Sequence, residues 1–193
     1  MRGQPADRVD KRESEDMRAL VIGGDGKLGS KLCTRLLERG HVVHKTTRRD
    51  DPDAPVRKNE SILKLNMLEP KLPPMGFGFN VVYIMAAITG VVPAERHPDA
   101  WRVNAEAPLL LAAEAFRRGD HVVFPSSGTV ELAPHTASAR QKSYVESHVL
   151  AGGGCVVRPL PYIRPEWYNE VADLFVAVGE DRRSGVVRWG EDK

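Results

Sequence analysis

A short apolar segment, Arg18–Ile22, runs directly into a glycine-rich turn, and an amphipathic stretch, Lys27–Arg39, follows that turn. The turn reads Gly-Gly-Asp-Gly-Lys-Leu-Gly over residues 23–29. Glycines allow the chain to turn tightly and let another group approach the backbone closely. The leucines of the following stretch share one helical face, and Gly40 is suited to end the helix. Residues 18–49 are therefore predicted to form a βαβ unit of the Rossmann kind.

The rest of the chain repeats this alternation of apolar runs and helical patterns. Five further runs are β-branched and bounded by turn residues: His41–Lys45, Ser61–Leu65, Val81–Met85, His121–Phe124 and Cys155–Val157. Helical patterns cover Pro98–Arg118 and Thr136–Leu150. Buried strands that alternate with amphipathic helices are typical of a parallel sheet covered on both faces. The sequence thus predicts an α/β fold, a Rossmann-like doubly wound parallel sheet over residues 17–158.

Composition argues against a nucleic-acid-binding, a membrane-spanning and a secreted protein. The chain carries 28 basic and 26 acidic residues, a balance that argues against a nucleic-acid partner. No stretch reaches the roughly 18 apolar residues of a membrane-spanning helix. Residues 1–16 are polar and lack the apolar core of a secretory signal, so we interpret them as a disordered leader. Cys33 and Cys155 are far apart and are expected to be buried free thiols of a cytoplasmic protein.

The glycine turn has the spacing of a dinucleotide-binding loop. Gly23, Gly26 and Gly29 satisfy G-x-x-G-x-x-G, and Gly24 adds the G-x-G-x-x-G spacing. A pyrophosphate would lie at the start of the following helix, beside Lys27 and Leu28, where backbone N–H groups attract negative charge. The alternative is a purely structural turn.

The end of the second strand indicates which dinucleotide is bound. Proteins that hold the ribose 2′-hydroxyl of NAD usually place an acid there. This strand ends instead in Thr46-Thr47-Arg48-Arg49. A guanidinium suits a 2′-phosphate, so Thr47 and Arg48 favour NADP, with NAD as the second choice. The alternative is a solvated pair of arginines.

Several motifs together resemble the extended short-chain dehydrogenases/reductases, which include NAD(P)-dependent epimerases, dehydratases and 4-keto-sugar reductases. They cover about residues 17–160 and are listed in chain order: Gly23–Gly29, Met85-Ala86-Ala87, Val103-Asn104-Ala105, residues 124–130 (FPSSGTV), residues 136–142 (TASARQK) and Val157-Arg158-Pro159. The resemblance implies that Ala86 and Ala87 line the nucleotide through their backbone. It also implies that relatives reduce, epimerise or dehydrate a sugar nucleotide.

The resemblance assigns the catalytic positions with one departure. Family members use a Ser or Thr after the fifth strand and a Tyr-x-x-x-Lys pair on the next helix, and these positions are Ser127, Ser138 and Lys142. Lys142 would also hold the nicotinamide ribose. The tyrosine position is Ser138, whose hydroxyl is less acidic and shorter than a phenol. Tyr144 lies two residues past Lys142, on roughly the opposite helix face.

Two kinds of function follow from these positions. One is an NAD(P)-binding protein of this family with a sugar nucleotide as its second ligand. The other is a non-catalytic nucleotide-binding or structural subunit, and a truncated product without function is a third reading. Residues 159–193 are expected to be the start of a truncated substrate lobe. The helices at 98–118 and 136–150 resemble a family dimer pair, which suggests a homodimer, and the histidine spacing suggests no metal site.

Overall fold

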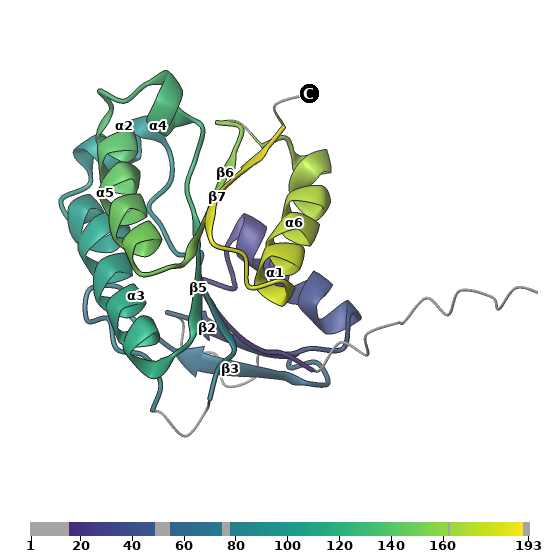
Figure 1. Ribbon diagram of the computed structural model, residues 1–193. Coiled ribbons are helices and arrows are strands. Elements are labelled where there is room, and N and C mark those ends of the chain that lie inside the picture. Colours follow the sequence, from purple (N-terminus) through teal and green to yellow (C-terminus); the bar gives the residue numbers. More distant parts are fainter. Residues whose placement is uncertain (1–15, 49–54, 75–77, 162, 191–193) are drawn as a thin grey trace, which may run out of the picture.

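A computed structural model describes residues 16–48, 55–74, 78–161 and 163–190, and it contains one parallel sheet in the order β3-β2-β1-β4-β5-β6-β7 (Figure 1). The strand bounds are β1 Arg18–Ile22, β2 Val42–Thr47, β3 Glu60–Lys64, β4 Val81–Ile84, β5 His121–Pro125, β6 Cys155–Pro159 and β7 Gly185–Trp189. Most of the leader predicted for residues 1–16 lies outside the described residues.

Helices cover both faces of this sheet, as Figure 1 shows, with α3 and α5 on one side and α1 and α6 on the other. The longer helices are α1 Lys27–Glu38, α3 Ala107–Arg118, α5 Ala137–Ala151 and α6 Tyr168–Glu180. Each face has its own apolar core: Leu111 and Val145 belong to the α3–α5 side, whereas Leu36 and Phe175 belong to the α1–α6 side. The predicted doubly wound Rossmann-like sheet is therefore confirmed.

Local sequence signals set several helix ends. Gly119, which follows α3, has a left-handed backbone with φ of 82°. Thr136 caps α5 by accepting a hydrogen bond from the Ala139 N–H at 3.2 Å. These features match the ends expected for the helical patterns at 98–118 and 136–150.

Three short elements escaped the pattern analysis, because each is too short for a hydrophobic stripe to develop. They are α2 Val91–Arg96, α4 Thr129–Leu132 and a 3₁₀ turn, η3, at Pro165–Trp167. The long helix expected at 98–118 is also interrupted: a π-helical turn, η2, occupies Arg102–Glu106 before α3 begins.

The structure corrects the expectation that residues 159–193 begin a separate lobe. β7 pairs in parallel with β6, and α6 packs along α1 on the sheet. Pro159 is the last residue of β6, and Pro161 and Pro165 lie in the connection between β6 and α6. A parallel strand needs a crossover helix, and α6 supplies one whose apolar side covers the sheet. These two elements therefore complete the Rossmann layer.

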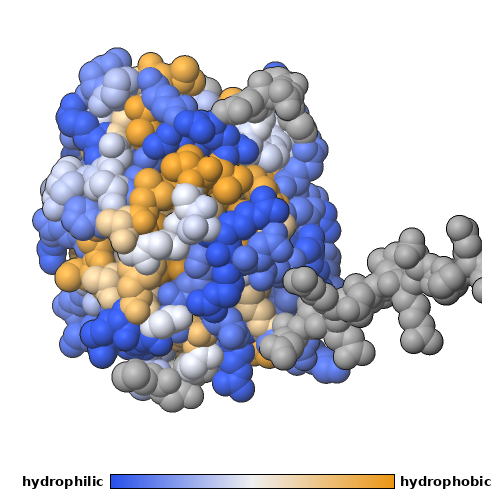
Figure 2. Space-filling view, in the orientation of Figure 1, coloured by the Kyte–Doolittle hydropathy of each residue, from blue (hydrophilic) through white to orange (hydrophobic). Residues whose placement is uncertain are grey.

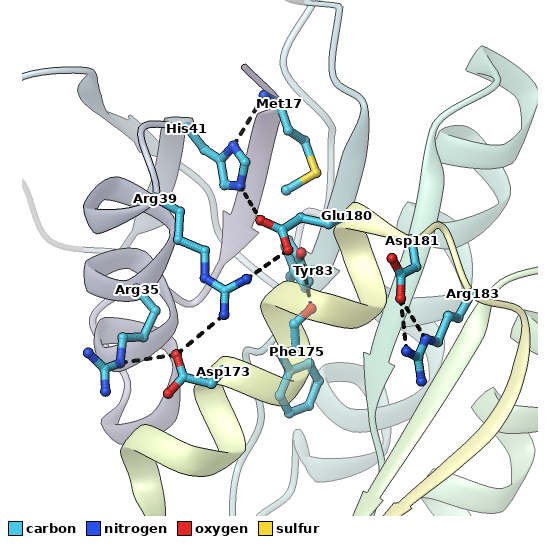
Figure 3. Close-up of polar contacts among 10 residues, drawn as sticks. All are labelled: Met17, Arg35, Arg39, His41, Tyr83, Asp173, Phe175, Glu180, Asp181 and Arg183. Atoms are coloured by element: carbon cyan, nitrogen blue, oxygen red, sulfur yellow. Dashed lines mark hydrogen bonds and ion pairs between the residues drawn. The ribbon is translucent and has the colours of Figure 1, made fainter. Parts of the chain in front are cut away.

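Polar contacts also join α6 to α1, as Figure 3 shows. Arg39 forms ion pairs with Glu180 at 2.8 Å and with Asp173 at 4.0 Å, and Arg35 contacts Asp173 at 3.2 Å. The fully buried His41 ring contacts the other Glu180 oxygen at 2.9 Å. The predicted burial of both free cysteines is confirmed.

The edge of the sheet at β7 is less covered than the sheet centre. Figure 2 shows hydrophobic residues gathered in the middle of the view, over the region where Figure 1 places β6 and β7. Four of the five β7 residues are half-buried, and β7 is the last strand of the described sheet. None of the described helices is both long and apolar enough to cross a bilayer.

Candidate functional site

The parallel strands bring the motifs found in the sequence to one edge of the sheet. The glycine turn follows β1, the Ala86–Ala87 segment follows β4, and the turn at Ser127 follows β5. Because β1, β4 and β5 are parallel neighbours, their carboxyl ends lie side by side. Ligands of open α/β sheets bind outside this edge.

The glycine turn is held closed by its own backbone and leaves the start of α1 open. The Gly26 N–H donates to the Gly23 carbonyl at 3.0 Å. Gly26 precedes α1, no side chain caps this helix, and its first turn contains no acid. The first N–H groups of α1 can therefore receive an anion.

Two of these glycines are required by the space around them. A Cβ at Gly23, where φ is +85°, would lie 2.7 Å from the Ala86 backbone. A Cβ at Gly29 would lie 2.3 Å from the Gly23 carbonyl oxygen. A Cβ at Gly26 would meet only that same oxygen, at 3.2 Å. The turn thus requires glycine at positions 23 and 29. A Cβ at Gly26, in contrast, would meet only one neighbouring atom within 4 Å.

The end of β2 lies beside the glycine turn. The buried Thr46 hydroxyl accepts a hydrogen bond from the Gly23 N–H at 3.1 Å. Thr47 ends the strand and is half-buried, and the next residue, Arg48, is exposed. Arg49 lies outside the described residues. Nothing in the sequence distinguishes Thr46 from other strand threonines, so its role in fixing the turn is visible only in the structure.

The segment after β4 is fixed by a buried asparagine of the π-helical turn. The Asn104 side chain accepts from the Ile88 N–H at 2.7 Å and donates to the Ile88 carbonyl at 2.9 Å. Ala86 is half-buried against Gly23, and Ala87 is exposed. The backbone of this segment therefore has a set position next to the glycine turn.

The turn after β5 contains the serine of the expected catalytic set. The Ser127 hydroxyl accepts a hydrogen bond from the Thr129 N–H at 3.2 Å. This contact gives the Ser127 hydroxyl a place in the turn, and its proton stays available for donation. The neighbouring Ser126 side chain is buried, and its hydroxyl has no hydrogen-bond partner among the described residues.

Lys142 approaches the same edge from α5. Its ammonium donates to the Pro125 carbonyl at 2.8 Å and lies 5.4 Å from the centre of the Phe124 ring. Burial lowers the pKa of Lys142 to about 8, and the nearby Glu146 opposes this shift. Ser138 is half-buried one helical turn earlier on α5. Lys142 is thus a cation held beside the β5 turn that loses its proton at a lower pH than an ordinary lysine.

Tyr144 is engaged on the outer side of α5. Its ring stacks on Trp101 with the centroids 5.6 Å apart. It also lines a groove of about 410 Å³ together with Val130, Pro134 and other residues of α4 and α5. Over the described ranges, no three His, Cys, Asp or Glu side chains gather as a metal site.

A family model described as the NAD dependent epimerase/dehydratase family matches residues 19–151. No curated protein matches the chain in sequence.

Solved structures share the fold at low identity. A hypothetical dTDP-4-dehydrorhamnose reductase from Sulfolobus tokodaii is 20% identical with a TM-score of 0.73, over 89% of this chain and 76% of that protein. The Bordetella bronchiseptica enzyme WbmH, solved with NAD+, is 13% identical with a TM-score of 0.70, over 92% and 77%. TunA, an NAD-dependent NDP-hexosamine 5,6-dehydratase of tunicamycin biosynthesis, is 20% identical with a TM-score of 0.73, over 92% and 77%.

The family model spans the glycine turn, the β4 segment, the β5 turn and the whole of α5. It therefore confirms the resemblance that the sequence motifs carried, and the neighbouring structures agree with it in fold. The chain belongs to the NAD dependent epimerase/dehydratase family.

Proposed function

We propose that the protein binds a nicotinamide dinucleotide along the carboxyl edge of its sheet, with NADP preferred to NAD. The observation that carries this proposal is the glycine turn, which packs on Ala86 and leaves the uncapped start of α1 open. The first turn of α1 has neither a capping side chain nor an acid, so its N–H groups fit a pyrophosphate.

The roles of the residues follow the order of the strands. Gly23, Gly26 and Gly29, with the N–H groups of Lys27 and Leu28, hold the pyrophosphate. Thr47 and Arg48 hold the 2′-phosphate at the end of β2. Ala86 and Ala87 line the nucleotide through their backbone, and Lys142 holds the nicotinamide ribose. When bound, the nicotinamide supplies or accepts a hydride.

The second ligand is a sugar nucleotide, placed above Ser127. The family is one of epimerases and dehydratases, and TunA acts on an NDP-hexosamine. In this arrangement the Ser127 hydroxyl donates a hydrogen bond to an oxygen of the sugar. Lys142 keeps a positive charge close to the same oxygen.

Ser138 favours a second candidate, a nucleotide-binding protein that does not catalyse the family reaction. General acid catalysis contributes roughly 10²–10⁴-fold to rate, and a serine hydroxyl is a poor substitute for a phenol. We therefore expect NADPH oxidation with 4-keto-sugar nucleotides to stay at or below detection by absorbance. Steady oxidation would instead show that another group donates the proton.

The proposal also includes the association of two copies of the protein into a homodimer. Three large apolar side chains are exposed on the face formed by η2, α3 and α5: Trp101, Leu110 and Tyr144. Their exposure supports burial against a second copy. Sedimentation of the wild type and of Leu110→Glu tests this part, with a monomeric wild type as the contrary result.

The cofactor proposal is tested by fluorescence titration with NADPH and NADH. We expect tighter binding of NADPH, and Arg48→Ala should weaken NADPH by about 1–3 kcal/mol, the range for a hydrogen bond to a charged group. NADH binding should change little. Lys31→Ala, which removes an exposed charge of α1, is the matched control. Equal affinities in the wild type would remove the NADP preference, and no binding of either would refute the proposal.

A further inference from the structure

A buried glutamine lies next to Lys142 and has no role in the sites described so far. Gln141 is only 3% exposed, although it stands in a helix where a polar residue usually faces water. Its side-chain oxygen accepts a hydrogen bond from Asn104 at 2.9 Å. Its side-chain nitrogen lies 3.5 Å from the Ala94 carbonyl oxygen. Gln141 therefore connects α5 to η2 and to α2.

The partner of Gln141 is the residue that fixes the segment after β4. Asn104 uses its oxygen and its nitrogen on the Ile88 backbone, and the same nitrogen donates to Gln141. It comes from a π-helical turn, a local insertion that is frequent at functional sites. A continuous path of hydrogen bonds thus runs from Ile88 through Asn104 to Gln141, the residue before Lys142.

We propose that Gln141 is a positioning residue, which sets Lys142 and the Ala86–Ile88 segment at a fixed separation and so shapes the nicotinamide half of the nucleotide site. This inference rests on the proposed function. The strand order indicates that Gln141 acts on the nicotinamide half of the nucleotide. Arg48 and the glycine turn follow β2 and β1 on one side of the sheet, and β4 and β5 lie on the other side. The Gln141 contacts all join elements around β4 and β5.

The test separates the two halves of the site. Gln141→Met keeps much of the side-chain volume and removes both polar contacts. We expect about tenfold weaker NADPH binding, the scale of losing a buried hydrogen bond. The affinities for ADP and 2′,5′-ADP, which lack the nicotinamide, should stay within about twofold of wild type, an allowance set by ordinary context effects. The emission maximum of bound NADPH should also shift toward that of free NADPH.

A purely structural role for Gln141 predicts a different pattern. General loosening would weaken ADP and NADPH equally, and either that result or unchanged NADPH binding would overturn the inference. If the Met variant does not fold, Gln141→Ser provides the same comparison. Binding of ADP itself reports that the glycine turn is intact.

A double-variant cycle tests the path through Asn104. If Gln141 acts through Asn104, adding Gln141→Met to Asn104→Ala should weaken NADPH little further. Additive losses would contradict the path. The wild type serves as the reference for the proposed function: its failure to bind NADPH would refute that function, whereas normal binding with unaffected Gln141 variants would refute this inference alone.

Discussion

At the residue scale, the glycine turn separates positions that build the fold from a position that serves binding. Gly23 and Gly29 have no room for a side chain, because their neighbours are backbone atoms closer than 3 Å to any added Cβ. Gly26 has an ordinary φ of −68° and a single close neighbour. A substitution at Gly26 is therefore the sharpest probe of the nucleotide site.

Gly26→Val should abolish NADPH binding and leave the fold intact. The added side chain would occupy the side from which a pyrophosphate approaches. Valine is also a poor residue before a helix, so we expect a loss of about 1 kcal/mol in the free energy of unfolding. Titration and urea unfolding measure the two effects, and Gly29→Ala is the contrasting variant, expected to lose much more stability. Normal binding by Gly26→Val would make the turn purely structural.

The buried charge of Lys142 lowers the stability of the folded protein. Its folded-state pKa is about 8, below the ordinary value of 10.5. The unfolded chain therefore holds the proton more tightly, and this destabilises the protein fully below about pH 8, with the effect fading as pH rises toward 10.5.

Lys142→Met should consequently gain stability relative to wild type at pH 7, and the gain should shrink as pH rises. Urea unfolding at several values from pH 7 to pH 10 measures the difference between the two proteins. Lys31→Met, on the exposed side of α1, controls for the loss of one positive charge. A difference that stays constant with pH would contradict the assigned pKa shift.

At the element scale, the contact between α1 and α6 combines a buried and an exposed part. Glu180 accepts from His41, whose side chain is 1% exposed, and also pairs with Arg39. Asp173 pairs with Arg35 and Arg39, whose side chains are 32% and 42% exposed. Figure 3 shows the two acids about two helical turns apart on α6, both facing α1.

Removal of these acids should have unequal effects. Glu180→Ala leaves the buried His41 ring without that partner, which should lower the free energy of unfolding by about 1–3 kcal/mol. Asp173→Ala breaks solvent-exposed pairs, each worth less than about 1 kcal/mol. Urea unfolding of both variants makes the comparison. Equal losses would mean that burial does not decide the strength of this network.

At the scale of the whole molecule, α6 and α1 together cover one face of the sheet, and β7 extends the sheet beyond β6. Four large apolar residues of α6 are fully buried: Val171, Phe175, Val176 and Val178. Burial of each contributes about 1.5–3 kcal/mol, so the set amounts to about 6–12 kcal/mol. This is comparable with the entire stability of a typical domain.

A chain that ends at Pro161 should therefore fail to fold. Circular dichroism and amide-exchange measurements on it should show an unfolded or molten chain. A cooperative unfolding transition in that shortened chain would mean that residues 17–158 fold without α6 and β7. If the protein binds NADPH as proposed, NADPH should raise its unfolding temperature, because a ligand that binds only the folded state stabilises that state.

The sequence alone determined most of the strands, the longer helices before residue 158 and the fold class. The periodicity of apolar residues, the glycines and prolines, and the caps such as Thr136 act locally, so they are readable without a structure. The order of motifs from Gly23 to Lys142 likewise identified the family, since spacing along the chain is a sequence property. The loss of the tyrosine at Ser138 was visible in the same way.

Contacts between distant residues were decided only by the tertiary structure. Asn104, Gln141 and Ile88 meet because a π-helical turn and two crossovers bring them together, and no periodicity encodes that meeting. α6 and β7 join the sheet because β7 pairs with β6 and α6 packs beside α1, and neither contact is visible in a single segment of sequence. Side-chain burial and strand pairing are properties of the assembled layers, so the pattern of a single segment does not say which sheet face a helix such as α6 covers.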